Sequence, residues 1–254
     1  MEIRYYKEYS RNLQREMEFK VYGSSGKPCL VIPSQNGRFY DFENFQMIKD
    51  CESFIEKGVL QVFCIDTIDE ETLSNVHASV RERMEQHEKW FWYVSDEFYK
   101  RMLEINREGT RQELWKMPMV AGCSMGAYHS ANFFFRRPDQ FDTLISLSGF
   151  YHLKMIIGEY MDDLVYLNSP YDSIAHLPKE HPYWKLYQRA DIMLCVGQGA
   201  WEEALLQETK KFDDLLQRQE VRAWVDYWGF DVSHDWTWWR KQWIYFLSYV
   251  MEKE

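Results

Sequence analysis

The sequence predicts an α/β fold, in which a mostly parallel central sheet carries helices on both faces as a three-layer sandwich. Short runs of apolar, β-prone residues alternate along the chain with longer segments whose apolar residues recur at helical spacing. This alternation is typical of parallel sheets, because each helix returns the chain across one face. A second observation is the pattern Gly122-Cys123-Ser124-Met125-Gly126, which stands between an apolar run and a helical segment. No linker interrupts the alternation, so we expect a single domain over residues 1–254.

The first elements are expected to be an antiparallel pair of strands. Residues 3–9 and 17–22 alternate aromatic and charged side chains, as strands with one covered face do. After a glycine-rich turn, residues 29–32 predict a short buried strand. Residues 42–57 have near-helical spacing and predict a helix that ends at Gly58.

The later elements follow the same alternation. We expect strands at residues 59–66, at the run that ends near Gly122, and at 141–147, 191–196 and 221–227, and helices at 79–108, from Gly126 to Arg136, at 201–220 and at 236–251. Residues 150–190 are the least regular part, with three prolines and many aromatic side chains. Because a long irregular stretch in a compact domain is often functional, we interpret residues 150–190 as a segment that covers the substrate.

Composition and charge exclude several classes of protein. The net charge of −10 comes without a basic stripe, so the chain lacks the electrostatic signature of a nucleic-acid-binding protein and would be repelled by anionic membranes. No apolar stretch reaches the ~18 residues that a membrane span needs, and the first residues lack an apolar signal core. We therefore expect a cytoplasmic protein without a membrane partner. The aromatic content of 17% makes a homodimer an expectation as well.

The five cysteines are scattered singly and their number is odd. This pattern favours reduced core thiols over a disulfide framework or a zinc site. No group of histidines has the spacing of metal ligands, so we expect neither a metal nor another cofactor.

The pattern around Ser124 matches the nucleophile elbow of α/β-hydrolases, in which a sharp strand-to-helix turn exposes a serine hydroxyl. This scheme needs an acid after a late strand and a histidine after the last one. Glu202 follows the expected strand 191–196, and His234 follows the expected strand 221–227. His234 would act as the general base, and Glu202 would orient its imidazole.

Some assignments stay open at this point. The acid could instead be another carboxylate of the same two loops, namely Glu203, Asp226, Asp231 or Asp235. The oxyanion hole is expected to use the backbone N–H of Met125 and one from Gln35 or Asn36, in the loop after residues 29–32. Ser124 could also be a structural turn residue, and His234 could anchor a loop.

At these residues the chain resembles the putative esterase family of α/β-hydrolases, which includes S-formylglutathione hydrolases and mycolyltransferase-like proteins. The segments that carry the resemblance are the elbow, residues 137–141 after it, residues 147–149, and residues 234–239 with the histidine. The resemblance implies that Ser124 and His234 are nucleophile and base. The chain departs from the family in two loops. The loop at residues 33–37 reads Pro-Ser-Gln-Asn-Gly where many members have a His-Gly or Asp-Gly pair, and the loop at residues 199–202 ends in Glu202 where many members place an Asp.

The function expected from these observations is a cofactor-free serine esterase that hydrolyses a carboxylic ester of a small molecule through an acyl-enzyme. An acyltransferase or a thioesterase would use the same groups and differ in the nucleophile that resolves the acyl-enzyme. A non-catalytic binding protein on a retained hydrolase fold is the alternative from another class.

Overall fold

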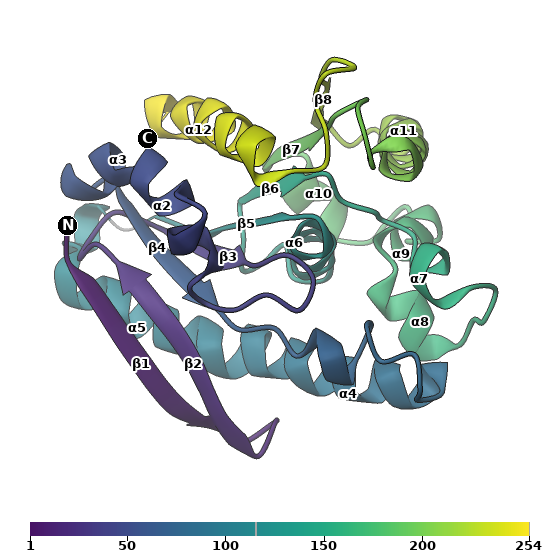
Figure 1. Ribbon diagram of the computed structural model, residues 1–254, viewed down its shortest axis with the longest axis horizontal. Helices are drawn as coiled ribbons and strands as arrows, with labels where there is room; N and C mark the ends of the chain where they lie inside the picture. The colour runs from purple at the N-terminus through teal and green to yellow at the C-terminus, as the bar shows by residue number, and fades with distance from the viewer. Residues whose placement is uncertain (115, 254) are drawn as a thin grey trace.

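The computed structural model describes residues 1–114 and 116–253 and has an eight-stranded sheet at its centre (Figure 1). The strands lie in the order β1-β2-β4-β3-β5-β6-β7-β8. Their bounds are β1 Ile3–Ser10, β2 Arg15–Tyr22, β3 Lys27–Ile32, β4 Leu60–Ile65, β5 Met119–Cys123, β6 Thr143–Leu147, β7 Asp191–Val196 and β8 Trp224–Tyr227. β1 and β2 pair antiparallel, β2 pairs antiparallel with β4, and the strands from β4 to β8 run parallel.

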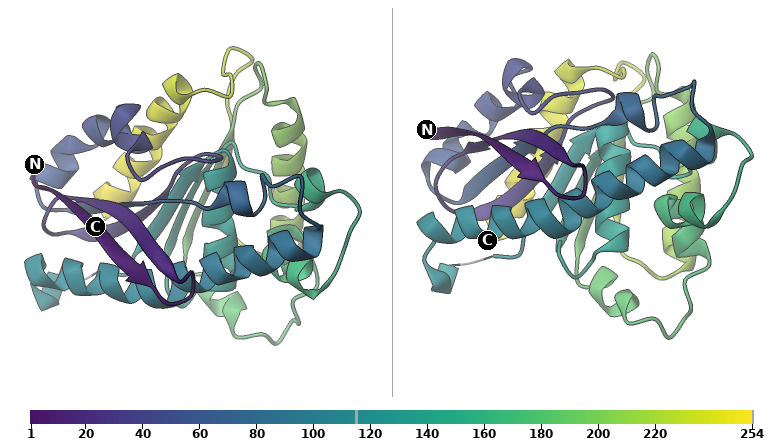
Figure 2. Two further views of the ribbon diagram at one scale, coloured as in Figure 1. Left: turned by 60° about the horizontal axis from the view of Figure 1, so that its bottom comes forward. Right: turned by 90° about the horizontal axis from the view of Figure 1, so that it is seen from below.

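Helices cover both faces of this sheet (Figure 2). On one face lie α1 Asp41–Asn44, α2 Met47–Asp50, α3 Glu52–Glu56 and α12 Trp236–Lys253, which share a buried apolar cluster with the sheet. On the other face lie α4 Val80–Trp92, α5 Tyr99–Gly109, α6 Met125–Arg136 and α11 Glu203–Arg218. The predicted fold class, a mostly parallel sheet between two helical layers, is confirmed.

One predicted helix is wrong in detail. Residues 42–57 do not form a continuous helix but the three short helices α1, α2 and α3. Gln46 separates α1 from α2 because its backbone is left-handed, with φ of 68°, and Cys51, with φ of −99° and ψ of 6°, separates α2 from α3. The apolar spacing still marks the side chains that face the core, since Phe42, Ile48 and Ile55 are all buried against the sheet. The helical stretch predicted at residues 79–108 is present as α4 and α5, joined by a π-helical segment at Tyr93–Phe98.

The segment of residues 150–190 is more regular than predicted. It contains four short helices, α7 Lys154–Ile157, α8 Asp163–Asn168, α9 Pro170–Ala175 and α10 Tyr183–Tyr187. The prolines suggested irregular chain, yet Pro170 begins α9 and Pro182 caps α10. Proline is well suited to the start of a helix, because its fixed φ is helical and its missing N–H would be unpaired there.

All five cysteines are buried and free, as predicted. Within residues 1–114 and 116–253, no helix is both long enough and apolar enough to cross a membrane. Among those same residues, no group of three or more histidine, cysteine, aspartate or glutamate side chains is arranged so that it could hold a metal ion.

Candidate active site

Ser124 stands at the sharp turn between β5 and α6. Its φ of 57° and ψ of −124° are an unusual backbone conformation for a residue with a side chain. The Ser124 N–H donates to the carbonyl of Leu147 at the end of β6, with 2.8 Å between N and O. A Cβ on Gly122 would come within 2.4 Å of the Gly126 backbone, so a glycine is needed for strand and helix to approach this closely.

The loop after β3 lies against the start of α6. A Cβ on Gly126 would lie 2.2 Å from the carbonyl oxygen of Pro33. This close contact brings residues 33–37 beside the elbow. Met125 is the first residue of α6, and the N–H groups of a first helical turn have no partner within the helix.

The Asn36 N–H donates to the Asp69 carboxylate at 3.0 Å, so its hydrogen bond is already made. Of the two expected donors in this loop, Gln35 is therefore favoured over Asn36.

His234 lies in the loop between β8 and α12, and its side chain reaches Ser124. The distance from His234 Nε2 to Ser124 Oγ is 2.9 Å, within hydrogen-bonding range. The His234 backbone N–H donates to the carbonyl of Ala200 at 3.0 Å, and the ring meets the Trp239 ring edge-on at 4.8 Å. The backbone of His234 and its ring are thus each held by one contact, while Nε2 of the ring faces the Ser124 hydroxyl.

The loop after β7 packs with its glycines against Val232 of the loop that carries His234. The Gly199 N–H donates to the Val232 carbonyl at 2.8 Å. A Cβ on Gly197 would lie 2.2 Å from that same carbonyl oxygen, so a larger residue would push the loops apart. This contact brings Glu202, at the start of α11, under the imidazole of His234.

Glu202 is fully buried, with its Oε2 at 3.4 Å from His234 Nδ1. This distance is longer than a good hydrogen bond, and catalytic contacts are often long without substrate. The other carboxylate oxygen accepts a hydrogen bond from the Ser148 hydroxyl at 2.5 Å. Ser148 in turn accepts from the indole Nε1 of Trp239 at 3.0 Å. The sequence predicted no role in the site for Ser148, which directly follows β6 and contacts Glu202, or for Trp239 on α12, which contacts Ser148.

The other carboxylates that the sequence left open do not contact the imidazole in the described part of the chain. Glu203 and Asp231 are exposed. Asp226 accepts from the Trp224 indole at 2.8 Å, and Asp235 accepts from the Thr237 N–H at 2.8 Å. Hydrogen bonds from the Thr237 hydroxyl and from its N–H lower the pKa of Asp235. The geometry therefore favours Glu202 among the five.

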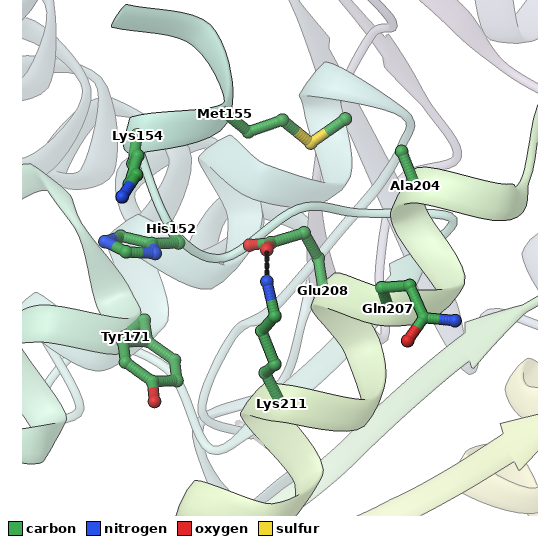
Figure 3. Close-up of a pocket in the computed structure, with 8 residues that line it drawn as sticks. All are labelled: His152, Lys154, Met155, Tyr171, Ala204, Gln207, Glu208 and Lys211. Atoms are coloured by element: carbon green, nitrogen blue, oxygen red, sulfur yellow. Dashed lines mark hydrogen bonds and ion pairs between the residues drawn. The ribbon is translucent and has the colours of Figure 1, made fainter. Parts of the chain in front are cut away.

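A cavity of about 550 Å³ lies between the segment 150–190 and α11 (Figure 3). Its lining residues are His152, Lys154, Met155, Tyr171, Ala204, Gln207, Glu208 and Lys211, and neither Ser124 nor His234 is among them. Lys154 is placed on one side, and Lys211 is paired with Glu208 on the other (Figure 3). One lining residue, Ala204, lies two positions after Glu202 in the sequence.

Comparison with known proteins gives a family and a set of similar folds. The family model described as "Putative esterase" matches residues 10–248. A solved S-formylglutathione hydrolase from Agrobacterium tumefaciens has a TM-score of 0.74 at 12% identity, over 98% of this chain and 94% of that one. An S-formylglutathione hydrolase from Staphylococcus aureus has a TM-score of 0.68 at 16% identity, over 98% and 97%. A ferulic acid esterase has a TM-score of 0.72 at 12% identity, over 99% and 98%. No curated protein sequence matches the chain significantly.

Proposed function

We propose that this chain, which belongs to the putative esterase family, hydrolyses carboxylic esters of small molecules through an acyl-enzyme on Ser124. The family match confirms the predicted resemblance. Membership in this family identifies the chain as a carboxylic ester hydrolase with the α/β-hydrolase fold. The observation that carries the proposed mechanism is the 2.9 Å contact between Ser124 Oγ and His234 Nε2. A hydroxyl and an imidazole at this distance have the geometry of an activated nucleophile and its base.

The acylation step would use both groups. His234 Nε2 takes the hydroxyl proton while Ser124 Oγ forms a bond to the ester carbonyl carbon, whose π electrons move to the oxygen. The tetrahedral intermediate collapses by breaking the bond to the leaving alkoxide, which receives the proton from His234. The product of this half-reaction is a free alcohol and an acyl group on Ser124.

Deacylation repeats the step with water. His234 removes a proton from a water molecule that attacks the acyl carbon, and it returns the proton to Ser124 Oγ as the carboxylic acid leaves. In both halves the negative oxygen would be stabilised by the N–H groups of Met125 and Gln35. Each such donor contributes ~3 kcal/mol to the transition state.

Glu202 is proposed to orient the imidazole, and Glu202→Gln tests that role. The substitution keeps the size of the buried side chain but replaces a carboxylate, so it cannot stabilise the imidazolium that forms during attack. We expect kcat/KM to fall by ~10⁴-fold with p-nitrophenyl acetate. Glu203→Gln, one position further on and exposed, is the matched control and should stay within about twofold. Equal effects of the two substitutions would exclude Glu202 as the acid.

The segment of residues 150–190 is proposed to help cover the substrate, with the cavity beside α11 accepting one of its groups. The exposed Ala204 on the cavity wall is the position for a test. Ala204→Trp should raise KM for a bulky aryl ester at least fivefold and leave p-nitrophenyl acetate unaffected, because the smaller ester does not fill the cavity. Lys210→Trp, exposed on the same helix, is the control. If the two esters lose activity equally in Ala204→Trp, the cavity does not select the substrate.

Pre-steady-state kinetics test the acyl-enzyme itself. With p-nitrophenyl acetate we expect a burst of p-nitrophenol close to one equivalent of enzyme when deacylation is slower than acylation. Mass spectrometry of the quenched protein should locate the acetyl group on the peptide that contains Ser124. A wild-type protein without turnover, burst or acetylation would favour the alternative of a binding protein on a hydrolase fold.

A further inference from the structure

The carboxylate of Asp69 joins the elbow helix to the loop that carries Gln35. Asp69 lies in a 3₁₀ helix at Asp69–Glu71, between β4 and α4, and is 2% exposed. Its Oδ1 is 2.8 Å from Nε2 of His129, on α6, and its Oδ2 accepts the hydrogen bond from the Asn36 N–H at 3.0 Å. One side chain therefore contacts the helix that follows Ser124 and the loop of the expected oxyanion donor.

The pair of Asp69 and His129 is sealed from solvent. Their side chains are 1% and 0% exposed. An ionised carboxylate has only acceptors, so His129 Nε2 carries the hydrogen of this contact. A buried carboxylate is costly unless its oxygens are hydrogen-bonded, which makes the contacts to His129 and Asn36 mutually dependent. A displacement of the loop at Asn36 would leave one carboxylate oxygen without its partner.

Further hydrogen bonds fasten the same loop to the chain that follows β4. The Gln35 side chain donates to the Ser74 hydroxyl at 2.8 Å, and the Thr67 hydroxyl donates to the Gly37 carbonyl at 3.3 Å. The Ser74 N–H donates to the Asp69 carbonyl at 2.8 Å, which ties this support together. The loop is thus held on both sides of Asn36, whose φ of 57° lies in the left-handed region that Asn adopts more readily than most residues with a side chain.

We propose that Asp69 and His129 are positioning residues, which hold the loop after β3 so that the Gln35 N–H points at the developing oxyanion. The inference rests on the proposed esterase function. Oxyanion donors act through being fixed in place before the reaction, and small displacements from their position cost large factors in rate. Because the loop is braced against α6, the donor from Gln35 and the donor from Met125 keep a constant separation.

The test replaces the carboxylate by groups that differ in whether they can accept from Asn36. Asp69→Leu removes the acceptor, and we expect kcat with p-nitrophenyl acetate to fall 10- to 100-fold while KM changes less than threefold. Asp69→Asn keeps one acceptor oxygen for Asn36 when His129 takes its other tautomer and accepts from the amide. The hydrogen then lies on His129 Nδ1, which is buried without a partner in the described part of the chain, so we expect Asp69→Asn to fold with a lower free energy of unfolding than wild type. This conservative variant should stay within about threefold of wild-type kcat.

Two further variants separate positioning from loss of fold. Asn106→Leu removes a buried polar side chain that bonds the Gly26 carbonyl at the opposite end of β3, and it should keep kcat. The double variant Asp69→Leu/His129→Phe replaces both members of the buried pair by apolar groups, which protein interiors tolerate better than one unpaired member. It should fold, as followed by circular dichroism, and show the low kcat of Asp69→Leu.

The affinity for a boronic acid that forms a tetrahedral anion on Ser124 is a second measurement. It would not change if Asp69 only stabilised the fold. This affinity should fall in Asp69→Leu by the same factor as kcat, whereas the affinity for a neutral ester analogue should not. If kcat and boronate affinity in the folded Asp69 variants match those of Asn106→Leu, Asp69 has no positioning role, although the esterase proposal stands. If wild-type protein shows neither turnover nor acylation of Ser124, both proposals are overturned.

Discussion

Replacing Ser124 by Ala is expected to abolish ester hydrolysis and covalent labelling while the fold persists. The substitution removes the oxygen that lies 2.9 Å from His234 Nε2 and that would form the acyl bond. Loss of a nucleophile of this kind lowers kcat by as much as ~10⁶-fold. A fluorophosphonate probe should label the wild-type protein at Ser124, detected by peptide mass spectrometry, and should leave Ser124→Ala unlabelled.

Stability and selectivity controls accompany this experiment. The Ser124 N–H bond to the Leu147 carbonyl belongs to the backbone and is kept, so we expect the free energy of unfolding to change by less than about 1 kcal/mol. Ser53→Ala, an exposed serine on α3, should be labelled and active like wild type. Labelling that persists in Ser124→Ala would mean that another residue is the nucleophile and would overturn the proposed mechanism.

Replacing His234 by Ala is expected to lower kcat by about 10⁴- to 10⁶-fold, because Ser124 then has no base to take its proton. The same substitution distinguishes catalysis from loop anchoring. The backbone N–H of residue 234, which donates to the Ala200 carbonyl, does not depend on the side chain. We therefore expect the folded state to be retained, measured by urea unfolding, while turnover of p-nitrophenyl acetate is lost.

The double variant Ser124→Ala/His234→Ala sharpens this expectation. Two groups that act as one unit have effects that do not add, so the double variant should be no slower than either single variant. His77→Ala, which removes an exposed histidine, is the control and should keep full activity. Multiplicative losses in the double variant would show that Ser124 and His234 contribute independently and would contradict a shared proton transfer.

The parallel sheet could be predicted because its strands are buried on both faces and are therefore almost wholly apolar in sequence. Strand β7, Asp191–Val196, has the bounds that the apolar run predicted. The helix predicted over residues 42–57 failed at Gln46, since apolar spacing records which side chains face the core and not the sign of φ at one position. The four helices in residues 150–190 were missed for a related reason, because each is too short to show a periodic pattern.

The candidate site divides in the same way. Ser124 and His234 could be singled out because the strand-turn-helix pattern and the chain order of the scheme are local or sequential signals. Glu202 could not be separated from four other carboxylates, since its place under the imidazole depends on the packing of Gly197 and Gly199 against Val232.

The amino-acid sequence by itself determined the fold class, the turn at Ser124 and the order in which the candidate residues Ser124, Glu202 and His234 follow one another, because periodicity and turn chemistry act over a few residues. Only the tertiary structure decided that Asp69 contacts both His129 and Asn36, and that Ser148 and Trp239 support Glu202. Those contacts join residues from different strands and helices. Their distances follow from how the layers pack, and no stretch of sequence records that packing locally.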